Sequence, residues 1–332
     1  HGWTFAPNGE LTNVPVMDGA AKDFRAQDFG LARAARVGNY RGFIFASMAE
    51  HGPSFDEHIG PIKGSIDDLV DRAPDGDIAF DAGMHRYIYH GNWKMQMDNG
   101  IDPYHLTSTH AGFMDVMGRR RDGEGNQAAR QFDWQKRLSQ QGGAFLFKNG
   151  HSAIWLNQAE VEKRPIYPAI EAIRARVGDT RADWMLKLRN LTVFPNMQIA
   201  DSTSLLVRSW RALAVDRTEL RYWCLAPVGE PAAQRAWRLR QFEDFFNSTG
   251  MATPDDTMCY EDCQTGYGSR SIDWQQGYSR GMTAVLQGPD KYADELGVKP
   301  VTSTCSQFDM QDETVFHAGY REWLRLMRKG VA

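Results

Sequence analysis

The sequence predicts an α+β domain in which long helices pack on an antiparallel sheet, and two observations indicate this class. Short runs of strand-type residues follow one another along the chain, and longer segments with helical spacing of apolar residues separate them. Strands that are neighbours in sequence tend to pair antiparallel, and helices then cover their sheet. The 332 residues, 42% hydrophobic and 24% charged, suit a globular protein with a sizeable core.

The first half of the chain alternates strand and helix signals. Residues 1–52 carry strand and turn signals without a helical period. Residues 53–73 show helix-like spacing of apolar residues, interrupted by Gly60, Pro61 and Gly64, and residues 77–90 partly alternate, as half-buried strands do.

The polar segment over residues 111–143 has no clean period, so we expect a lid or mobile loop there. Beyond it, Asn149-Gly150 between two strand-type runs predicts a β-hairpin. We expect one helix over residues 168–188, then strands over residues 191–194, 205–210 and 220–225.

Two amphipathic helices are expected in the C-terminal half, over residues 231–246 and 312–329. Pro231 suits the first turn of the earlier helix because a proline lacks only a donor that is unpaired there. The apolar face expected for the last helix consists of Val315, Tyr320, Trp323, Leu324 and Met327.

Charge and cysteine content narrow the functional classes. A net charge of −4 and a pI near 6.2 argue against nucleic acid as a partner, and no apolar run is long enough to span a membrane. Four scattered cysteines fit a cytoplasmic protein with reduced thiols. We expect Cys259 and Cys263 to be small buried residues. The chain starts with His1 rather than Met, so we expect a fragment of a longer protein.

Residues 92–110 hold the strongest candidate for a chemical site. Asp102, His105 and His110 form the pattern D-x2-H-x4-H, and imidazole with carboxylate suits iron or zinc. On a straight helix the two histidines would lie about 140° apart, so sharing a metal requires the helix to end, kink or bulge between them. Spacing alone supports a metal site and a metal-free, capped helix with two partly exposed histidines equally well.

A second carboxylate is available in the segment Gly250–Asp256, from either Asp255 or Asp256. Thr253 as a helix cap, Pro254 as the first helical residue and two acidic residues at the helix N-terminus explain the segment without any metal. The same geometry would keep a carboxylate ionised and fixed, as a metal ligand should be.

Several motifs occur together in a recognisable order. They are HGWTF at residue 1, NWK at residue 92, D-x2-H-x4-H, the turn Phe194-Pro195-Asn196 and GMATPDD at residue 250. In this set the chain resembles the large (α) subunits of Rieske non-heme iron ring-hydroxylating oxygenases. The segments DNGIDPYH, APVGE and FEDFFN resemble the benzoate, toluate and anthranilate dioxygenase branch, although Asp98 stands where that branch usually has Glu.

The resemblance implies a fold and a site. It implies a helix-grip, Bet v 1-like catalytic domain over residues 53–332, preceded at residues 1–52 by the C-terminal remnant of an all-β Rieske domain. His105, His110 and Asp256 would be the ligands of a mononuclear Fe(II).

Three further residues receive roles from the resemblance. Asp102 would bridge His105 to the cluster of a neighbouring subunit, and Asn99 would line the iron pocket. His1 would be a ligand of the [2Fe–2S] cluster, whose other ligands this sequence lacks. We therefore expect a cluster only in the full-length protein and expect the fragment alone to be inactive.

The function implied is cis-dihydroxylation of an aromatic carboxylate such as benzoate or anthranilate, with O2 as co-substrate. Electrons would come from NADH through a separate reductase or ferredoxin, and a β subunit would complete an α3β3 assembly. Three rivals stay open at this point: a salicylate-type monohydroxylase on the same site, a metal-free module that binds apolar ligands, and a zinc hydrolase.

Overall fold

The computed structural model of the protein describes residues 1–15, 22–80, 83–102, 105–122, 140–271, 277–307 and 313–329. It divides into two compact units, residues 1–60 and residues 61–332. The assignment of residues 1–52 to a Rieske domain and of residues 53–332 to a catalytic domain stays a prediction.

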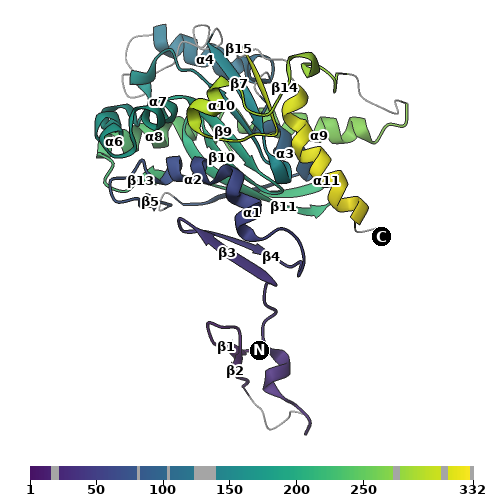
Figure 1. The fold of residues 1–332 in the computed structure, drawn as a ribbon. Helices are drawn as coiled ribbons and strands as arrows, with labels where there is room; N and C mark the ends of the chain where they lie inside the picture. Colours follow the sequence, from purple (N-terminus) through teal and green to yellow (C-terminus); the bar gives the residue numbers. More distant parts are fainter. Residues whose placement is uncertain are drawn as a thin grey trace. The chain divides into compact units, whose positions relative to one another are not determined.

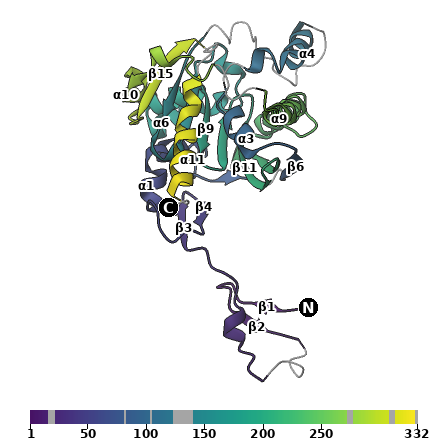
Figure 2. The same ribbon diagram turned by 90° about the vertical axis from the view of Figure 1, so that its right-hand side faces the viewer.

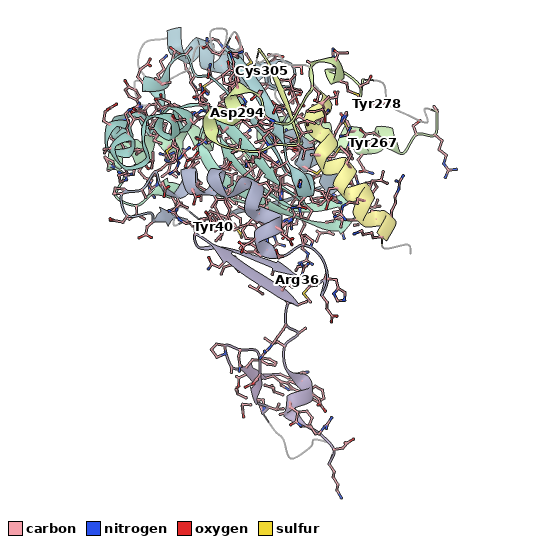
Figure 3. All side chains as sticks on the ribbon, viewed as in Figure 1. Arg36, Tyr40, Tyr267, Tyr278, Asp294 and Cys305 are labelled. Carbon is pink, nitrogen blue, oxygen red and sulfur yellow. The ribbon has the colours of Figure 1, made fainter. Side chains whose placement is uncertain are left out.

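The first unit contains two short antiparallel pairs. Strand β1 (Thr4–Phe5) pairs with β2 (Leu11–Asn13), and β3 (Arg36–Tyr40) pairs with β4 (Phe43–Ser47). The turn η2 (Ala26–Phe29) follows β2. Arg36 and Tyr40 mark the two ends of β3 (Figure 3). Helix α1 (Phe55–Ile59) closes the unit and begins with a capping box, in which Ser54 and Glu57 satisfy each other's backbone N–H groups.

A nine-stranded sheet organises the described part of the second unit (Figure 1). All of its neighbouring strands run antiparallel, so the predicted α+β class with an antiparallel sheet is confirmed. In spatial order the strands are β14 (Leu286–Gln287), β15 (Thr302–Gln307), β7 (Gln141–Leu146), β8 (Ser152–Leu156), β9 (Leu188–Val193), β10 (Met197–Asp201), β11 (Leu205–Ala214), β12 (Arg217–Cys224) and β6 (His85–Tyr89). Strands β5 (Ile78–Ala79) and β13 (Ala226–Pro227) form a separate pair.

Helices cover both faces of this sheet. Helices α2 (Lys63–Val70), α7 (Asp179–Leu186) and α10 (Lys291–Leu296) lie over one face, and α6 (Ile170–Val177) packs against α7. The other face carries α3 (Trp93–Asn99), α4 (Ala111–Asp122) and α8 (Ala232–Phe245), which share one apolar core with the sheet. Figure 2 shows α9 (Thr253–Tyr267) beside α3, and α11 (His317–Lys329) lies on the same side of the second unit as these two helices. The short turns include η4 (His105–Thr107), η5 (Lys148–Gly150) and η9 (Glu313–Phe316).

Side chains alternate between the two faces of the central strands. Leu206 and Trp210 of β11 join the core beneath α3 and α8. On the opposite face Asp201 at the end of β10 is buried between the guanidinium groups of Arg72 and Arg164. Burial opposes its charge, but the two arginines outweigh this effect and lower the pKa of Asp201 to about 2.

Glycine conformation decides the outcome of two local predictions about the fold, one of which is confirmed and one of which is wrong. The hairpin expected at Asn149-Gly150 is confirmed, with positive φ angles of 62° and 80° at the two residues. The single helix predicted over residues 168–188 is wrong. Gly178 has a φ of 86°, which is incompatible with a helix, and the segment forms α6 and α7 on either side of it.

Three other predictions are wrong in whole or in part. Residues 111–122 form helix α4 rather than a loop, while residues 123–139 lie outside the described part of the chain. Cys263 is exposed and Cys259 half-buried on α9, so neither belongs to the core. Of the apolar face expected for the last helix, Val315 is buried, but Leu324 and Met327 are exposed.

Within the described residues, every helix is too short or too polar to cross a lipid bilayer.

Candidate metal centre

Two helices and the turn that follows one of them position the candidate residues. Asn99 is the last residue of α3, whose first turn is capped by the side chain of Asn92. The chain leaves the helix there, His105 begins the turn η4, and His110 directly precedes α4. The helix thus ends before the first histidine, so the two histidines do not share a straight helix and the 140° separation expected on one does not apply.

Helix α9 supplies the remaining candidate, and polar bonds fix it against the start of α3. The side chains of Glu261 and Gln264 accept hydrogen bonds from the backbone N–H groups of His90 and Asn92, each at 2.9 Å. The expected cap at Thr253 is not found, because its hydroxyl donates to the carbonyl of Phe246 instead. These contacts set the position from which α9 directs its first turn towards the histidines.

The structure brings His105, His110 and Asp256 together. Asp256 Oδ1 lies 3.1 Å from His110 Nε2 and 3.7 Å from His105 Nε2. One potential ligand atom from each residue lies within 4.8 Å of the others, and this is the one such group of three found in the described part of the chain. The rings of the two histidines meet edge to face, with centroids 5.0 Å apart.

The neighbouring carboxylate, Asp255, is placed differently. Its Oδ2 lies 3.6 Å from Nδ1 of His110, but its side chain is 40% exposed and is not part of the group of three. The side chain of Asp256 is 12% exposed and lies between the two rings. The geometry therefore favours Asp256 over Asp255 as the third potential ligand.

The polar atoms of this group fit a metal ion. His110 is fully buried, and neither of its ring nitrogens makes a hydrogen bond within the described residues. A buried polar atom without a partner is costly, and a cation bound at Nε2, the nitrogen that faces Asp256, would remove that cost for this atom. Ligand atoms about 2.0–2.2 Å from one ion lie roughly 3–4 Å from each other. The two distances to Asp256, 3.1 and 3.7 Å, fall in that range.

Asp102 lies on the outer side of His105. Its Oδ2 is 3.3 Å from Nδ1 of the ring, on the opposite edge from the nitrogen that faces Asp256. Burial opposes a charge on His105, but hydrogen bonding to Asp102 and the charges of Asp102 and Asp256 raise its pKa above the ordinary value. The surroundings of the ring therefore favour positive charge, whether a proton or a metal ion carries it.

Asn99 links the group to the sheet. Its Nδ2 donates to Asp256 Oδ1 at 2.9 Å and lies 3.4 Å from Nε2 of His105. Its Oδ1 accepts a hydrogen bond from Arg208 at 3.2 Å. Sequence reasoning overlooked Arg208, because a single arginine in a strand carries no motif that ties it to residues more than a hundred positions earlier.

A cavity of about 70 Å³ adjoins the three residues. Most of the surface area of its wall is apolar, although polar side chains also line it, as in binding sites that orient a small ligand. The apolar residues are Leu106, Ile154, Leu188, Phe245 and Phe246, and the polar ones beyond the group itself are Asn99, Asp102, Asn190, Ser202, Thr203 and Arg208.

His1, the remaining candidate, is exposed and lies in the first unit. Its expected role as a cluster ligand stays a prediction.

Comparison with known proteins gives consistent matches. The family model described as "Ring hydroxylating alpha subunit (catalytic domain)" matches residues 77–299. The chain is 36% identical to the 2-halobenzoate 1,2-dioxygenase large subunit of Burkholderia cepacia, over the whole chain and 71% of that relative. It is 35% identical to the toluate 1,2-dioxygenase subunit alpha of Pseudomonas putida, over the whole chain and 72% of that relative.

A solved structure of naphthalene 1,2-dioxygenase from Rhodococcus sp. shares the fold. The TM-score is 0.78 at 21% identity, and the match covers 98% of this chain and 74% of that one.

Proposed function

This chain belongs to the family of ring-hydroxylating oxygenase alpha subunits, and on that premise we propose that it catalyses cis-dihydroxylation of an aromatic carboxylate. The family uses a mononuclear iron and a Rieske [2Fe–2S] cluster. The observation that carries the proposal is the convergence of His105, His110 and Asp256 beside the cavity.

We propose that these three residues hold Fe(II), as a two-histidine, one-carboxylate set with open coordination positions. When bound, the iron would supply the activation of O2 that neither imidazole nor carboxylate can provide. The side chains around it keep the site ordered. Asp102 orients the ring of His105 through Nδ1. The apolar part of the cavity wall, which includes Phe245, excludes water from a substrate bound in the cavity.

An aromatic carboxylate is the substrate class that the relatives support, because two of them are named for halobenzoate and toluate. The cavity wall suits a flat ring with one polar end. Leu106, Ile154 and Leu188 can contact the ring, while Asn190 and Ser202 offer polar groups to a carboxylate.

Electron supply completes the proposal. Members of the family are terminal oxygenases that take electrons from a separate reductase or ferredoxin. We propose that residues 1–52 belong to the Rieske domain that receives them, that His1 is a cluster ligand, and that Asp102 connects His105 to the cluster of a neighbouring subunit. A β subunit would complete an α3β3 assembly.

Iron content tests the ligand assignment. We expect His105→Ala and Asp256→Ala to abolish stoichiometric iron binding, because each removes one of three protein ligands. Asp255→Ala is the matched control, since it removes the adjacent carboxylate and should retain iron. Stoichiometric iron in purified Asp256→Ala would exclude that residue as a ligand.

Product analysis separates dihydroxylation from monohydroxylation on the same site. With 18O2 and benzoate, the complete enzyme with its reductase should give a cis-diol that contains two labelled oxygen atoms. A phenolic product with one labelled atom would instead establish the monohydroxylase.

A further inference from the structure

Arg208 is a buried cation that has no carboxylate partner at ion-pair distance in the described part of the chain. It lies in β11 on the wall of the cavity and is only 8% exposed. No carboxylate of the described residues lies within ion-pair distance of its guanidinium. A buried charge is normally paired, because removing it from water is costly. The contacts that Arg208 does make therefore require an explanation.

The guanidinium contacts the oxygen atoms of two neutral amides. Its Nε donates to Gln198 Oε1 at 2.7 Å, and its Nη2 donates to Asn99 Oδ1 at 3.2 Å. Asn99 continues the series by donating from Nδ2 to Asp256 Oδ1 at 2.9 Å. Hydrogen bonds thus run in one direction, from a strand of the sheet through the end of α3 to the first turn of α9.

The chemistry of these groups allows a single orientation of the Asn99 amide. Arginine can only donate, so the amide oxygen must face Arg208. An ionised carboxylate can only accept, so the amide NH2 must face Asp256. The nearby positive charge also polarises the amide, which strengthens the bond that its NH2 group makes to the carboxylate.

Gln198, which holds the other side of the guanidinium, is itself fixed. It is 1% exposed, and its Nε2 donates to the carbonyl of Met97 at 3.0 Å and to Thr192 Oγ1 at 2.7 Å. It reaches α3 only because residue 100 is glycine. A Cβ there would lie 1.9 Å from Gln198 Nε2, although the backbone of Gly100 is ordinary, with a φ of −67°.

We infer that Arg208 is a positioning residue for the metal centre: through its hydrogen bond to Asn99, it holds Asp256 in the orientation that binds the metal. The inference rests on the proposed role of Asp256 as a ligand. It assigns one oxygen of that carboxylate partly to the Asn99 amide, which restricts how the group can turn towards the ion. Residues that orient metal ligands in this way typically change metal affinity by about 10–100-fold when they are lost.

Cobalt(II) provides a test that does not depend on turnover, because its visible spectrum reports ligand geometry. In anaerobic titrations of the purified protein we expect Arg208→Met to weaken Co(II) binding roughly tenfold and to alter the absorption bands. Arg211→Met is the matched control. Arg211 lies on the same strand, is exposed, and should bind Co(II) as the wild type does. Arg208→Lys keeps a charged donor and should recover part of the affinity.

A double-mutant cycle with Asn99→Ala separates this role from a general structural one. If Arg208 acts through Asn99, then Arg208→Met should add little to the loss of Co(II) affinity that Asn99→Ala already causes. An equal loss in both backgrounds, or wild-type affinity in Arg208→Met, would overturn the inference. Should Arg208→Met not fold, the same cycle with Arg208→Lys decides.

Asp256→Ala distinguishes the two levels of the argument. Wild-type Co(II) affinity in that variant would remove the ligand assignment itself. Loss of Co(II) in Asp256→Ala, combined with unchanged binding in Arg208→Met, would leave the metal site in place and refute only the role of Arg208.

Discussion

Gly100→Ala should destabilise the second unit strongly, although alanine is a better helix former than glycine. The added Cβ would lie 1.9 Å from Nε2 of Gln198, so the Gln198 amide must move. That movement breaks the bonds of Nε2 to Met97 and Thr192 and disturbs the bond between Oε1 and Arg208. Two neutral hydrogen bonds at about 1 kcal/mol each and one charged bond at about 1.5 kcal/mol give a loss of roughly 3.5 kcal/mol.

Urea unfolding followed by tryptophan fluorescence measures this loss. Trp3 is the only one of the ten tryptophans before residue 61, so the signal reports mainly on the second unit. With a slope of about 1–3 kcal/mol per molar urea, the midpoint should fall by about 1 M or more. Gly266→Ala is the control. Gly266 is exposed near the end of α9 and no atom lies within 4 Å of its Cβ position, so we expect a change between zero and a gain of about 1 kcal/mol. If Gly100→Ala were as stable as Gly266→Ala, the claim that Gln198 is held rigidly at this site would be wrong.

Three further predictions concern charge. Burial raises the pKa of Asp98 to about 8, although Tyr320 donates a hydrogen bond to its carboxylate at 2.7 Å, so the stability of the wild type should fall as the pH rises from about 4 to about 8. Asp98→Asn should remove this fall in urea titrations, and an unchanged pH profile would contradict the assignment. Because the pKa of Asp201 is lowered to about 2, its contribution to stability should be complete above pH 4 and be lost as the pH falls towards 2. Asp201→Asn should cost about 3–5 kcal/mol of stability at pH 7, because it leaves two buried arginines without their anion, and a loss below 1 kcal/mol would contradict this. In the complete enzyme Asp102→Ala should retain most of its iron but lose coupled turnover, and wild-type coupling between NADH oxidation and product would exclude a role in electron transfer.

The sequence predicted those parts of the fold that depend on local patterns. The hairpin at Asn149-Gly150 and the helix over residues 231–246 follow from turn chemistry and from amphipathic spacing, which act within a few residues. Gly178 shows the limit of that approach. Apolar spacing continued across it, and the positive φ that breaks the helix there leaves no trace in the periodicity.

For the site, the sequence supplied the candidates but not their connection. His105 and His110 could be named from residue type, and the segment Gly250–Asp256 supplied a carboxylate, but spacing alone left Asp255 and Asp256 equivalent. The structure separates them, because the side chain of Asp256 lies between the two rings while that of Asp255 is more exposed. Arg208 and Gln198 were beyond prediction, because their importance comes from strand pairing that brings distant parts of the chain against α3.

The position of Asp256 on α9 has a consequence for biosynthesis. During translation His105 and His110 are synthesised early, whereas Asp256 is added only after the strands β7–β12 and helix α8 have been synthesised. Contacts between such distant segments form late in folding, because loop closure must precede them. During synthesis the two histidines alone would bind iron weakly, so tight metal loading should begin only once the chain has passed α9 and closed its sheet. Metal uptake by ribosome-bound intermediates of increasing length would then time the completion of this unit.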